Sequence, residues 1–170
     1  MIYFNGKFVP EREAVVSVMD RGFLYGETLF ETVRFYRRKP FLWKEHMARY
    51  VGGCEALQIE RALTGDEMLR VGMELIARNG IQNGFLRVTT SRGVGRRGYS
   101  IGGSNDPMFC MTVHPLAPGT RKVFRVMIAS NPIYSANPLA CYKHGNKLSQ
   151  ILARMEADRA GADEALLLNE

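Results

Sequence analysis

Apolar and polar positions alternate over several short stretches of this chain. Residues 28–36 are rich in β-branched and aromatic side chains and predict a strand with one polar face. Asn5-Gly6, between two short apolar runs, is typical of a two-residue hairpin because a type I′ turn needs positive φ at both central positions. Residues 85–91 and 108–114 also contain β-branched and aromatic side chains and predict two more strands.

Apolar residues recur at helical spacing in two stretches between residues 43 and 80. Residues 43–57 predict a helix, although two adjacent glycines weaken its second half. Thr64 followed by Glu67 is a capping box, so a second helix is expected to begin there and to end before Gly80.

A break at residues 116–119, which include Pro-Gly, predicts the boundary between two domains, 1–117 and 118–170. The second domain is expected to contain a strand at 123–129, a helix at 146–160 and a strand at 164–168. We therefore expect an α+β fold, with a two-layer N-terminal domain and the opening elements of a C-terminal domain. A strand that directly follows a helix normally pairs and continues, so this second domain is expected to extend beyond residue 170.

Composition excludes several classes of protein. Of the 170 residues 46% are hydrophobic and 24% charged, as in soluble globular domains. The three cysteines form no C-x-x-C pair, and the histidines lack neighbours at ligand spacing, so neither disulfides nor a metal site is expected. Without a leader-like start or a long apolar run, we expect a cytoplasmic protein that does not enter membranes.

The net charge of +6 is compatible with an anionic partner or with a surface charge that only aids solubility. Stacking aromatics do not alternate with the basic residues, which argues against nucleic acid and leaves phosphate or carboxylate ligands.

A glycine- and arginine-rich loop follows the strand predicted at 85–91. Gly93, Gly95 and Gly98 spell G-x-G-x-x-G, but a dinucleotide-binding loop must open a helix, and residues 100–107 contain three helix-breaking positions. The loop's arginines could close over a carboxylate or phosphate, although composition fits a solvated loop at least as well.

Lys143 has a setting that could lower its pKa. An apolar stretch, residues 138–142, precedes it, and His144 and Lys147 are close by in the sequence. Desolvation and nearby positive charge favour a neutral amine, and a neutral amine can attack an aldehyde. By itself this setting supports a reactive lysine only weakly.

Four stretches together resemble the class IV (fold-type IV) pyridoxal-phosphate aminotransferase family. This family includes branched-chain aminotransferases, D-amino-acid aminotransferases and aminodeoxychorismate lyases. The stretches occur in family order and are Val16–Thr32 (VSVMDRGFLYGETLFET), Glu45–Arg49 (EHMAR), Ser91–Tyr99 (SRGVGRRGY) and Tyr142–Asn146 (YKHGN), the last continuing to Gly161–Leu166 (GADEAL).

The resemblance implies that Lys143 binds the cofactor, pyridoxal 5′-phosphate, covalently and that Arg49 binds its phosphate. Three departures stand out. Glu27-Thr28 replaces the family's usual Asp-Gly, and Lys147 occupies a position where branched-chain enzymes often have tyrosine. Family members also continue well past residue 170, and their later part carries the acidic partner of the pyridine nitrogen. We therefore expect this chain to be part of a longer protein.

For the substrate, the resemblance implies that Tyr25 and Phe30 line the pocket and that Arg97 faces a carboxylate, with Arg87 as the rival arginine. It further implies a homodimer that transfers an amino group between an amino acid, most often of the branched-chain type, and a 2-oxo acid. Two alternatives stay open. One is an aminodeoxychorismate lyase that releases pyruvate and 4-aminobenzoate, the branch that the Ser91–Tyr99 loop resembles. The other is a non-catalytic basic domain that binds anions or a partner.

Overall fold

The computed structural model describes residues 1–103, 106–116, 119 and 123–170. Contacts divide the chain into two compact units. Unit 1 comprises Met1–Leu116 together with Tyr142–Gly145, and unit 2 comprises the described residues that remain. The predicted domain boundary between residues 117 and 118 lies outside the described residues.

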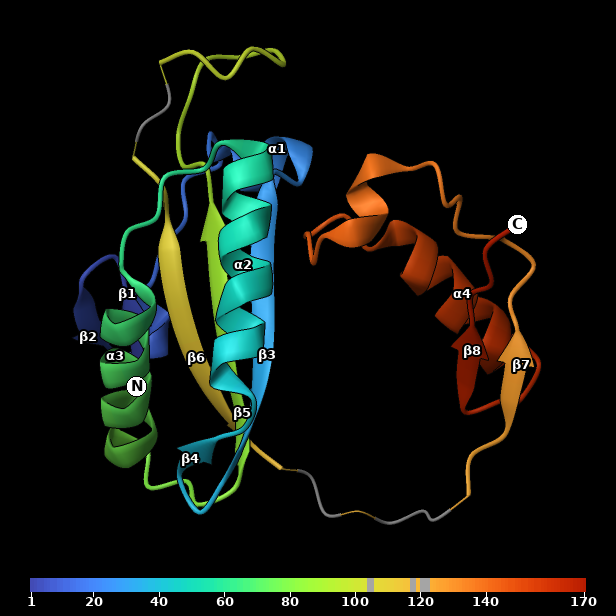
Figure 1. Ribbon diagram of the computed structural model, residues 1–170, viewed down its shortest axis with the longest axis horizontal. Helices are drawn as coiled ribbons and strands as arrows, with labels where there is room; N and C mark the ends of the chain where they lie inside the picture. The colour runs from blue at the N-terminus through green and yellow to red at the C-terminus, as the bar shows by residue number, and fades with distance from the viewer. Residues whose placement is uncertain (104–105, 117–118, 120–122) are drawn as a thin grey trace. The chain divides into compact units, whose positions relative to one another are not determined.

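Unit 1 is built on a six-stranded sheet whose neighbouring strands are all antiparallel, in the order β2-β1-β6-β5-β3-β4 (Figure 1). The strands are β1 (Ile2–Phe4), β2 (Lys7–Val9), β3 (Thr28–Tyr36), β4 (Lys39–Pro40), β5 (Gly84–Ser91) and β6 (Phe109–Pro115). The helices are the short 3₁₀ turn η1 (Glu11–Glu13), α1 (Arg21–Tyr25), α2 (Trp43–Leu57) and α3 (Gly65–Arg78).

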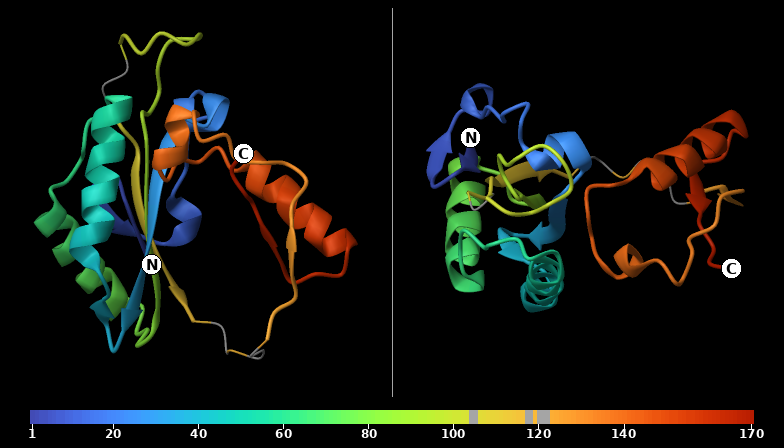
Figure 2. Two further views of the ribbon diagram at one scale, coloured as in Figure 1. Left: turned by 45° about the vertical axis from the view of Figure 1, so that its right-hand side comes forward. Right: turned by 90° about the horizontal axis from the view of Figure 1, so that it is seen from above.

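Buried and half-buried residues alternate along the central strands, so the sheet has one buried face and one half-buried face. In β3 and β5 every second residue is buried, and α2 and α3 cover this face (Figures 1 and 2). The core between the helices and the sheet includes Leu29, Val33, Phe35, Met47, Tyr50, Cys54, Met68, Leu75, Ile76, Leu86, Val88, Phe109 and Met111. The predicted two-layer α+β arrangement is thus confirmed for this unit.

Local signals in the sequence correspond to observed turns and caps. Asn5 and Gly6 have φ of 43° and 88°, as the hairpin between β1 and β2 requires. At the start of α3 the Thr64 side chain accepts from the Glu67 amide, and the Glu67 carboxylate accepts from the Thr64 amide at 2.8 Å. The capping box is therefore complete.

The glycine pair in α2 does not end the helix, which runs to Leu57. Gly53 is buried, and a Cβ at this position would lie 3.0 Å from a methyl group of Leu29. Because the glycine allows α2 to approach β3 closely, packing offsets its low helix propensity.

Unit 2 contains a two-stranded parallel sheet of β7 (Val126–Ile128) and β8 (Glu164–Leu166), with the 3₁₀ turn η2 (Pro138–Cys141) and helix α4 (Leu148–Arg159) between them in sequence. Its helix buries Ala153 and Ala157. Polar contacts tie the unit together, because Glu156 accepts from the amide and hydroxyl of Ser130, both at 3.0 Å. In the described part of the chain no helix has the length and apolar character to cross a membrane.

Candidate functional site

Lys143 belongs to unit 1 because its backbone pairs with the edge of β3. The Phe30 amide donates to the Lys143 carbonyl at 2.9 Å, and the Gly145 amide donates to the Thr28 carbonyl at 2.9 Å. A Cβ on Gly145 would overlap the Thr28 hydroxyl, so this close approach requires glycine. The segment Tyr142–Gly145 is thus fixed along the strand, and with it the starting point of the Lys143 side chain.

The Lys143 side chain is half-buried and lies against an aromatic ring. Its Nζ is 4.5 Å from the centroid of the Phe30 ring, and the Arg87 guanidinium carbon lies 3.9 Å from the same centroid. Burial lowers the pKa of Lys143, the Glu31 carboxylate opposes this change, and the positive charges of Arg49 and Arg87 add to it. The net effect lowers the pKa, which favours the neutral amine required for nucleophilic attack.

Glu31 is a fully buried carboxylate on the helix-facing side of β3, with an exposed fraction of 0%. It accepts from Arg49 Nε at 2.6 Å and from Arg49 Nη2 at 2.8 Å, and the His46 ring nitrogen Nδ1 lies 2.8 Å away. Burial acts to raise the pKa of Glu31, but the hydrogen bonds and charges of Arg49 and His46 outweigh it and leave the pKa below its ordinary value. Glu31 is therefore a buried anion with two partners on α2.

Arg49 is oriented by this bidentate pair but stays accessible. Glu31 occupies its Nε and one terminal nitrogen, and the hydrogen bond to Glu31 raises the pKa of Arg49. The side chain is 48% exposed, so its guanidinium can still meet an anion such as a phosphate.

Adjacent residues of β3 act on Lys143 from both sides of the sheet. Phe30 and Glu31 point to opposite faces because successive strand residues alternate. Both influence the amine because the Lys143 segment runs along the strand's edge. A ligand with an aldehyde and a phosphate group would find an amine and a guanidinium in one unit of the fold.

Among the site residues predicted from the sequence, Lys143, Phe30, Arg87 and Arg49 come together around this strand edge. Tyr25 has a different set of contacts. Its hydroxyl accepts from the Gly98 amide at 2.9 Å, so it holds the basic loop, which we define as residues 92–103.

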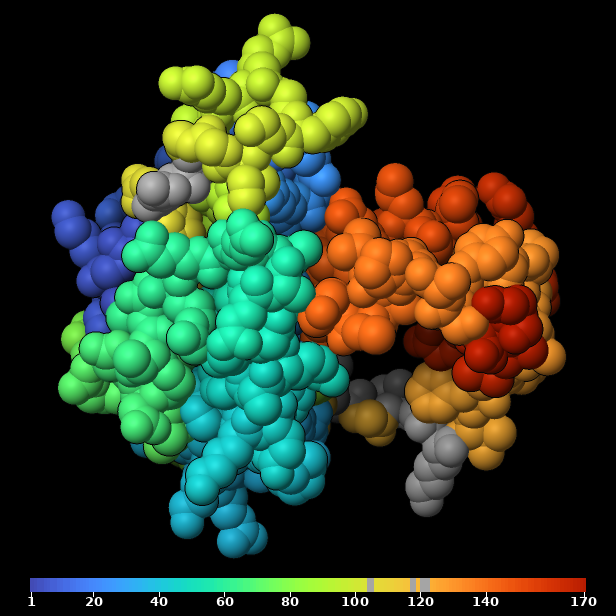
Figure 3. Space-filling model, turned by 45° about the horizontal axis from the view of Figure 1, so that its top comes forward, coloured from blue at the N-terminus to red at the C-terminus, as the bar shows by residue number. Residues whose placement is uncertain are grey.

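The basic loop projects from the surface of unit 1 (Figure 3), and Arg97 on it is exposed. The charges that act on Lys143 are those of Glu31, Arg49 and Arg87, and they do not include Arg97. The G-x-G-x-x-G glycines lie at the start of this loop, and the chain from Val94 to Gly103 forms no helix. This geometry agrees with the rejection of a dinucleotide-binding loop.

Sequence reasoning assigned no role to Glu31, although a signal for it exists. In the alternating pattern of residues 28–36 it occupies a position on the same face as Leu29 and Val33, and a charge on a buried face requires a partner. Within the residues that the structure describes, no cluster of three His, Cys, Asp or Glu side chains could hold a metal ion.

Comparison with known proteins identifies relatives along most of the chain. A family model described as amino-transferase class IV matches residues 28–170. A protein of Methanocaldococcus jannaschii named "Putative branched-chain-amino-acid aminotransferase" is 37% identical over 175 residues, which covers 99% of this chain and 59% of the relative. An aminodeoxychorismate lyase of Bacillus subtilis is 37% identical over 120 residues, which covers 69% of this chain and 41% of the lyase.

A solved structure shows the same architecture. The branched-chain amino acid aminotransferase from Escherichia coli superposes with a TM-score of 0.88 and 25% identity. The match covers 99% of this chain and 57% of that structure. The chain therefore spans about three-fifths or less of the length of each of these relatives.

Proposed function

This chain belongs to the class IV aminotransferase family, and we propose on that premise that the protein containing it is a pyridoxal-phosphate-dependent transaminase. It would transfer an amino group between an amino acid, of the branched-chain type, and a 2-oxo acid. The resemblance on which the sequence analysis relied is thereby confirmed at the level of the family.

The observation that carries the proposal is the environment of Lys143. Its amine starts from a backbone fixed on β3, lies over the Phe30 ring and has its pKa lowered by burial and by two arginines. A lowered pKa increases the fraction of neutral amine, which is the form that condenses with an aldehyde.

The residues present fit the cofactor that the family uses. Lys143 would hold the aldehyde carbon, and Arg49, kept in place by Glu31, would hold the phosphate through its accessible guanidinium edge. When bound, pyridoxal 5′-phosphate supplies the conjugated ring that takes up the electron pair left by a departing α-proton.

The free Lys143 amine would act as the general base. It would take the proton from the Cα of the amino acid, a step for which a lowered pKa is suited. Phe30 and Arg87 would border the same amine and restrict how the substrate approaches it. By the resemblance, Arg97 on the basic loop would bind the substrate carboxylate as a bidentate partner, with Arg87 as the rival for this role.

A second activity is supported by a specific observation, the 37% identity to an aminodeoxychorismate lyase. The same lysine would then act in a reaction that releases pyruvate and 4-aminobenzoate. Incubation of the full-length protein with aminodeoxychorismate, followed by measurement of pyruvate, separates the two reactions, because a transaminase without lyase activity releases none.

The test of the main proposal is chemical labelling of the full-length protein loaded with the cofactor. Borohydride reduction and digestion should give one pyridoxyl-modified peptide, which contains Lys143, and the Lys143→Ala protein should give none. Adduct on another peptide would refute the assignment. A protein that takes up no cofactor would favour the non-catalytic basic domain.

A further inference from the structure

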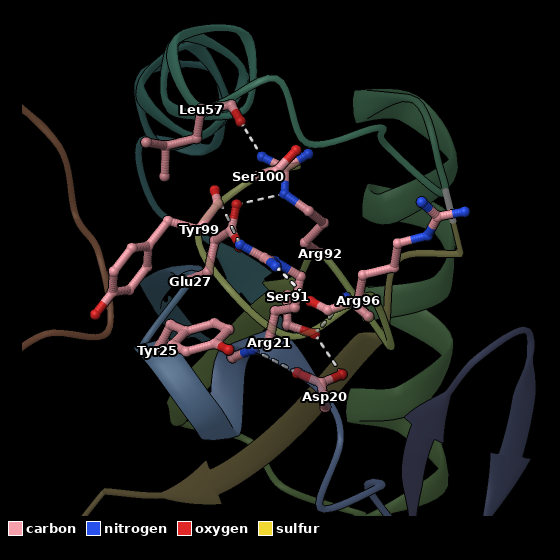
Figure 4. Close-up of polar contacts among 12 residues, drawn as sticks. Asp20, Arg21, Tyr25, Glu27, Leu57, Ser91, Arg92, Arg96, Tyr99 and Ser100 are labelled. Atoms are coloured by element: carbon pink, nitrogen blue, oxygen red, sulfur yellow. Dashed lines mark hydrogen bonds and ion pairs between the residues drawn. The ribbon is translucent and has the colours of Figure 1, made fainter. Parts of the chain in front are cut away.

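The basic loop is anchored to α1 on both sides of Arg97. The Arg21 guanidinium donates through Nη1 to the carbonyl of Gly98 at 2.8 Å. The same nitrogen donates to the carbonyl of Arg96 at 3.1 Å, and Figure 4 shows both of these arginines. The Gly98 amide donates to the Tyr25 hydroxyl, and the Arg21 guanidinium lies 4.9 Å from the Tyr25 ring centroid. The backbone before and after Arg97 is thus held by two side chains of one short helix.

Arg21 is in turn held by Glu27, as Figure 4 shows. Its Nε donates to Glu27 Oε2 at 2.6 Å, and the other carboxylate oxygen accepts from Arg92 Nε. Arg92 also donates to the carbonyls of Leu57 and Gln58, the latter at 2.7 Å, at the end of α2, where the last carbonyls have no partner within the helix. We call this cluster the Arg21–Glu27–Arg92 triad.

The triad needs its carboxylate because both arginines are removed from water. The exposed fractions of the side chains are 3% for Arg21, 6% for Arg92 and 16% for Glu27. Without this largely buried carboxylate, the two guanidinium groups that share it would repel each other, and each would need water in place of its lost partner. Loss of the carboxylate would therefore weaken the hold of Arg21 on the loop carbonyls that it now binds.

Glu27 also lies next to the strand along which the Lys143 segment runs. It directly precedes β3, whose first residue, Thr28, accepts from the Gly145 amide. The Arg92 amide donates to the Glu27 carbonyl at 3.3 Å. One residue therefore connects the basic loop, the end of α2 and the strand along which the Lys143 segment lies.

We propose that Glu27 is a positioning residue for substrate recognition, because it holds Arg21 and thereby sets where Arg97 presents its guanidinium. This inference rests on the proposed function, in which Arg97 binds the substrate carboxylate. A bidentate arginine discriminates by position, so a loop that is no longer anchored weakens carboxylate binding and leaves the chemistry at Lys143 intact.

Steady-state kinetics of the full-length, cofactor-loaded protein test this role, with L-leucine and 2-oxoglutarate as substrates. In the Glu27→Gln variant we expect the KM for both to rise about tenfold, with kcat within about threefold of the wild type. Glu27→Asp keeps the charge and should restore part of the loss. Glu74→Gln is the matched control, because it removes the same charge from an exposed pair with Arg78 and should change neither constant.

A second measurement follows the loop without any substrate. Trypsin cleaves after Arg96 and Arg97, and cleavage requires the loop to leave its anchor. Cleavage at these two bonds should be about tenfold faster in Glu27→Gln than in the wild type or in Glu74→Gln.

The outcomes separate the inference from the proposed function. An active wild-type protein whose Glu27→Gln variant keeps its KM for both substrates overturns the inference, and a fall in thermal stability alone would mark the triad as purely structural. Unchanged cleavage in Glu27→Gln also overturns it. If the wild-type protein neither labels at Lys143 nor transaminates, the proposed function fails, and the role of Arg97 fails with it even where cleavage is faster.

Discussion

The buried carboxylate of Glu31 gives the sharpest prediction, because its replacement by glutamine keeps the shape and removes the charge. The wild-type side chain is 0% exposed and takes two hydrogen bonds from Arg49, at 2.6 and 2.8 Å, with His46 at 2.8 Å. In Glu31→Gln one side-chain oxygen remains to accept from Arg49. The NH2 group that replaces the other oxygen is uncharged and cannot accept a hydrogen bond, so the second contact to Arg49 and the contact to His46 lose their anionic acceptor.

A hydrogen bond to a charged group contributes about 1.5–3 kcal/mol. Arg49 is 48% exposed and recovers part of its hydration when the pair is broken, so the three contacts do not add in full. We therefore expect Glu31→Gln to lower the free energy of unfolding by about 2–3 kcal/mol at pH 7. The pair of Glu74 and Arg78, which are 46% and 48% exposed, serves as the control. Glu74→Gln should lower the free energy of unfolding by less than about 0.5 kcal/mol.

Urea denaturation of the full-length proteins measures both values, and the fluorescence of Trp43 reports on the start of α2. The pKa of Glu31 is lowered in the folded state, so its contribution is present above the unfolded pKa of about 4.3 and is lost as the pH falls through the lower folded value. The difference between wild type and Glu31→Gln should therefore shrink only below about pH 4. Two results would refute this account of Glu31. One is a loss of unfolding free energy in Glu31→Gln at pH 7 no larger than that in Glu74→Gln, and the other is a loss that stays unchanged down to pH 3.

Three further changes have defined outcomes. Arg87→Gln removes a positive charge that lowers the pKa of Lys143, so acetic anhydride labelling of this lysine should shift to higher pH, whereas an unchanged profile would contradict the electrostatic account. Gly145→Ala should cost roughly 1–3 kcal/mol of unfolding free energy through overlap with the Thr28 hydroxyl, and the added change Thr28→Ala should recover part of it in urea denaturation. Thr64→Ala should lower stability by about 1 kcal/mol through loss of the cap, which calorimetry would detect as a lower Tm.

Elements with strong local signals were predictable from the sequence. The alternating pattern of residues 28–36 corresponds to β3 residue for residue, and α2 has the predicted bounds. The turn between β3 and β4 was missed, because Arg37 and Arg38 adopt φ of 48° and 64° without the usual glycine or asparagine. Their amides donate to Asn83 and Gln82, distant partners in the sequence that no local pattern reveals.

The site was predictable only in part for the same reason. Lys143 and Arg49 were singled out through resemblance to a family, and their roles remain proposals. The lowered pKa of Lys143 depends first on burial and then on the charges of Arg49 on α2 and Arg87 on β5, against that of Glu31 on β3, and local spacing does not bring these groups together. Arg21 and Glu27 are six residues apart and Arg92 follows 65 residues later, so no helical or strand period links the triad.

The segment Tyr142–Gly145 has a consequence for how the molecule can be divided experimentally. It packs as part of unit 1, yet unit 2 supplies the residues on both sides of it in sequence. A truncation after residue 116, the natural choice from the strand and helix pattern, would remove the amine from the sheet that controls its ionisation. Because backbone pairing with β3 holds these residues in place, a shortened protein keeps the amine on its sheet only if it includes residues 142–145.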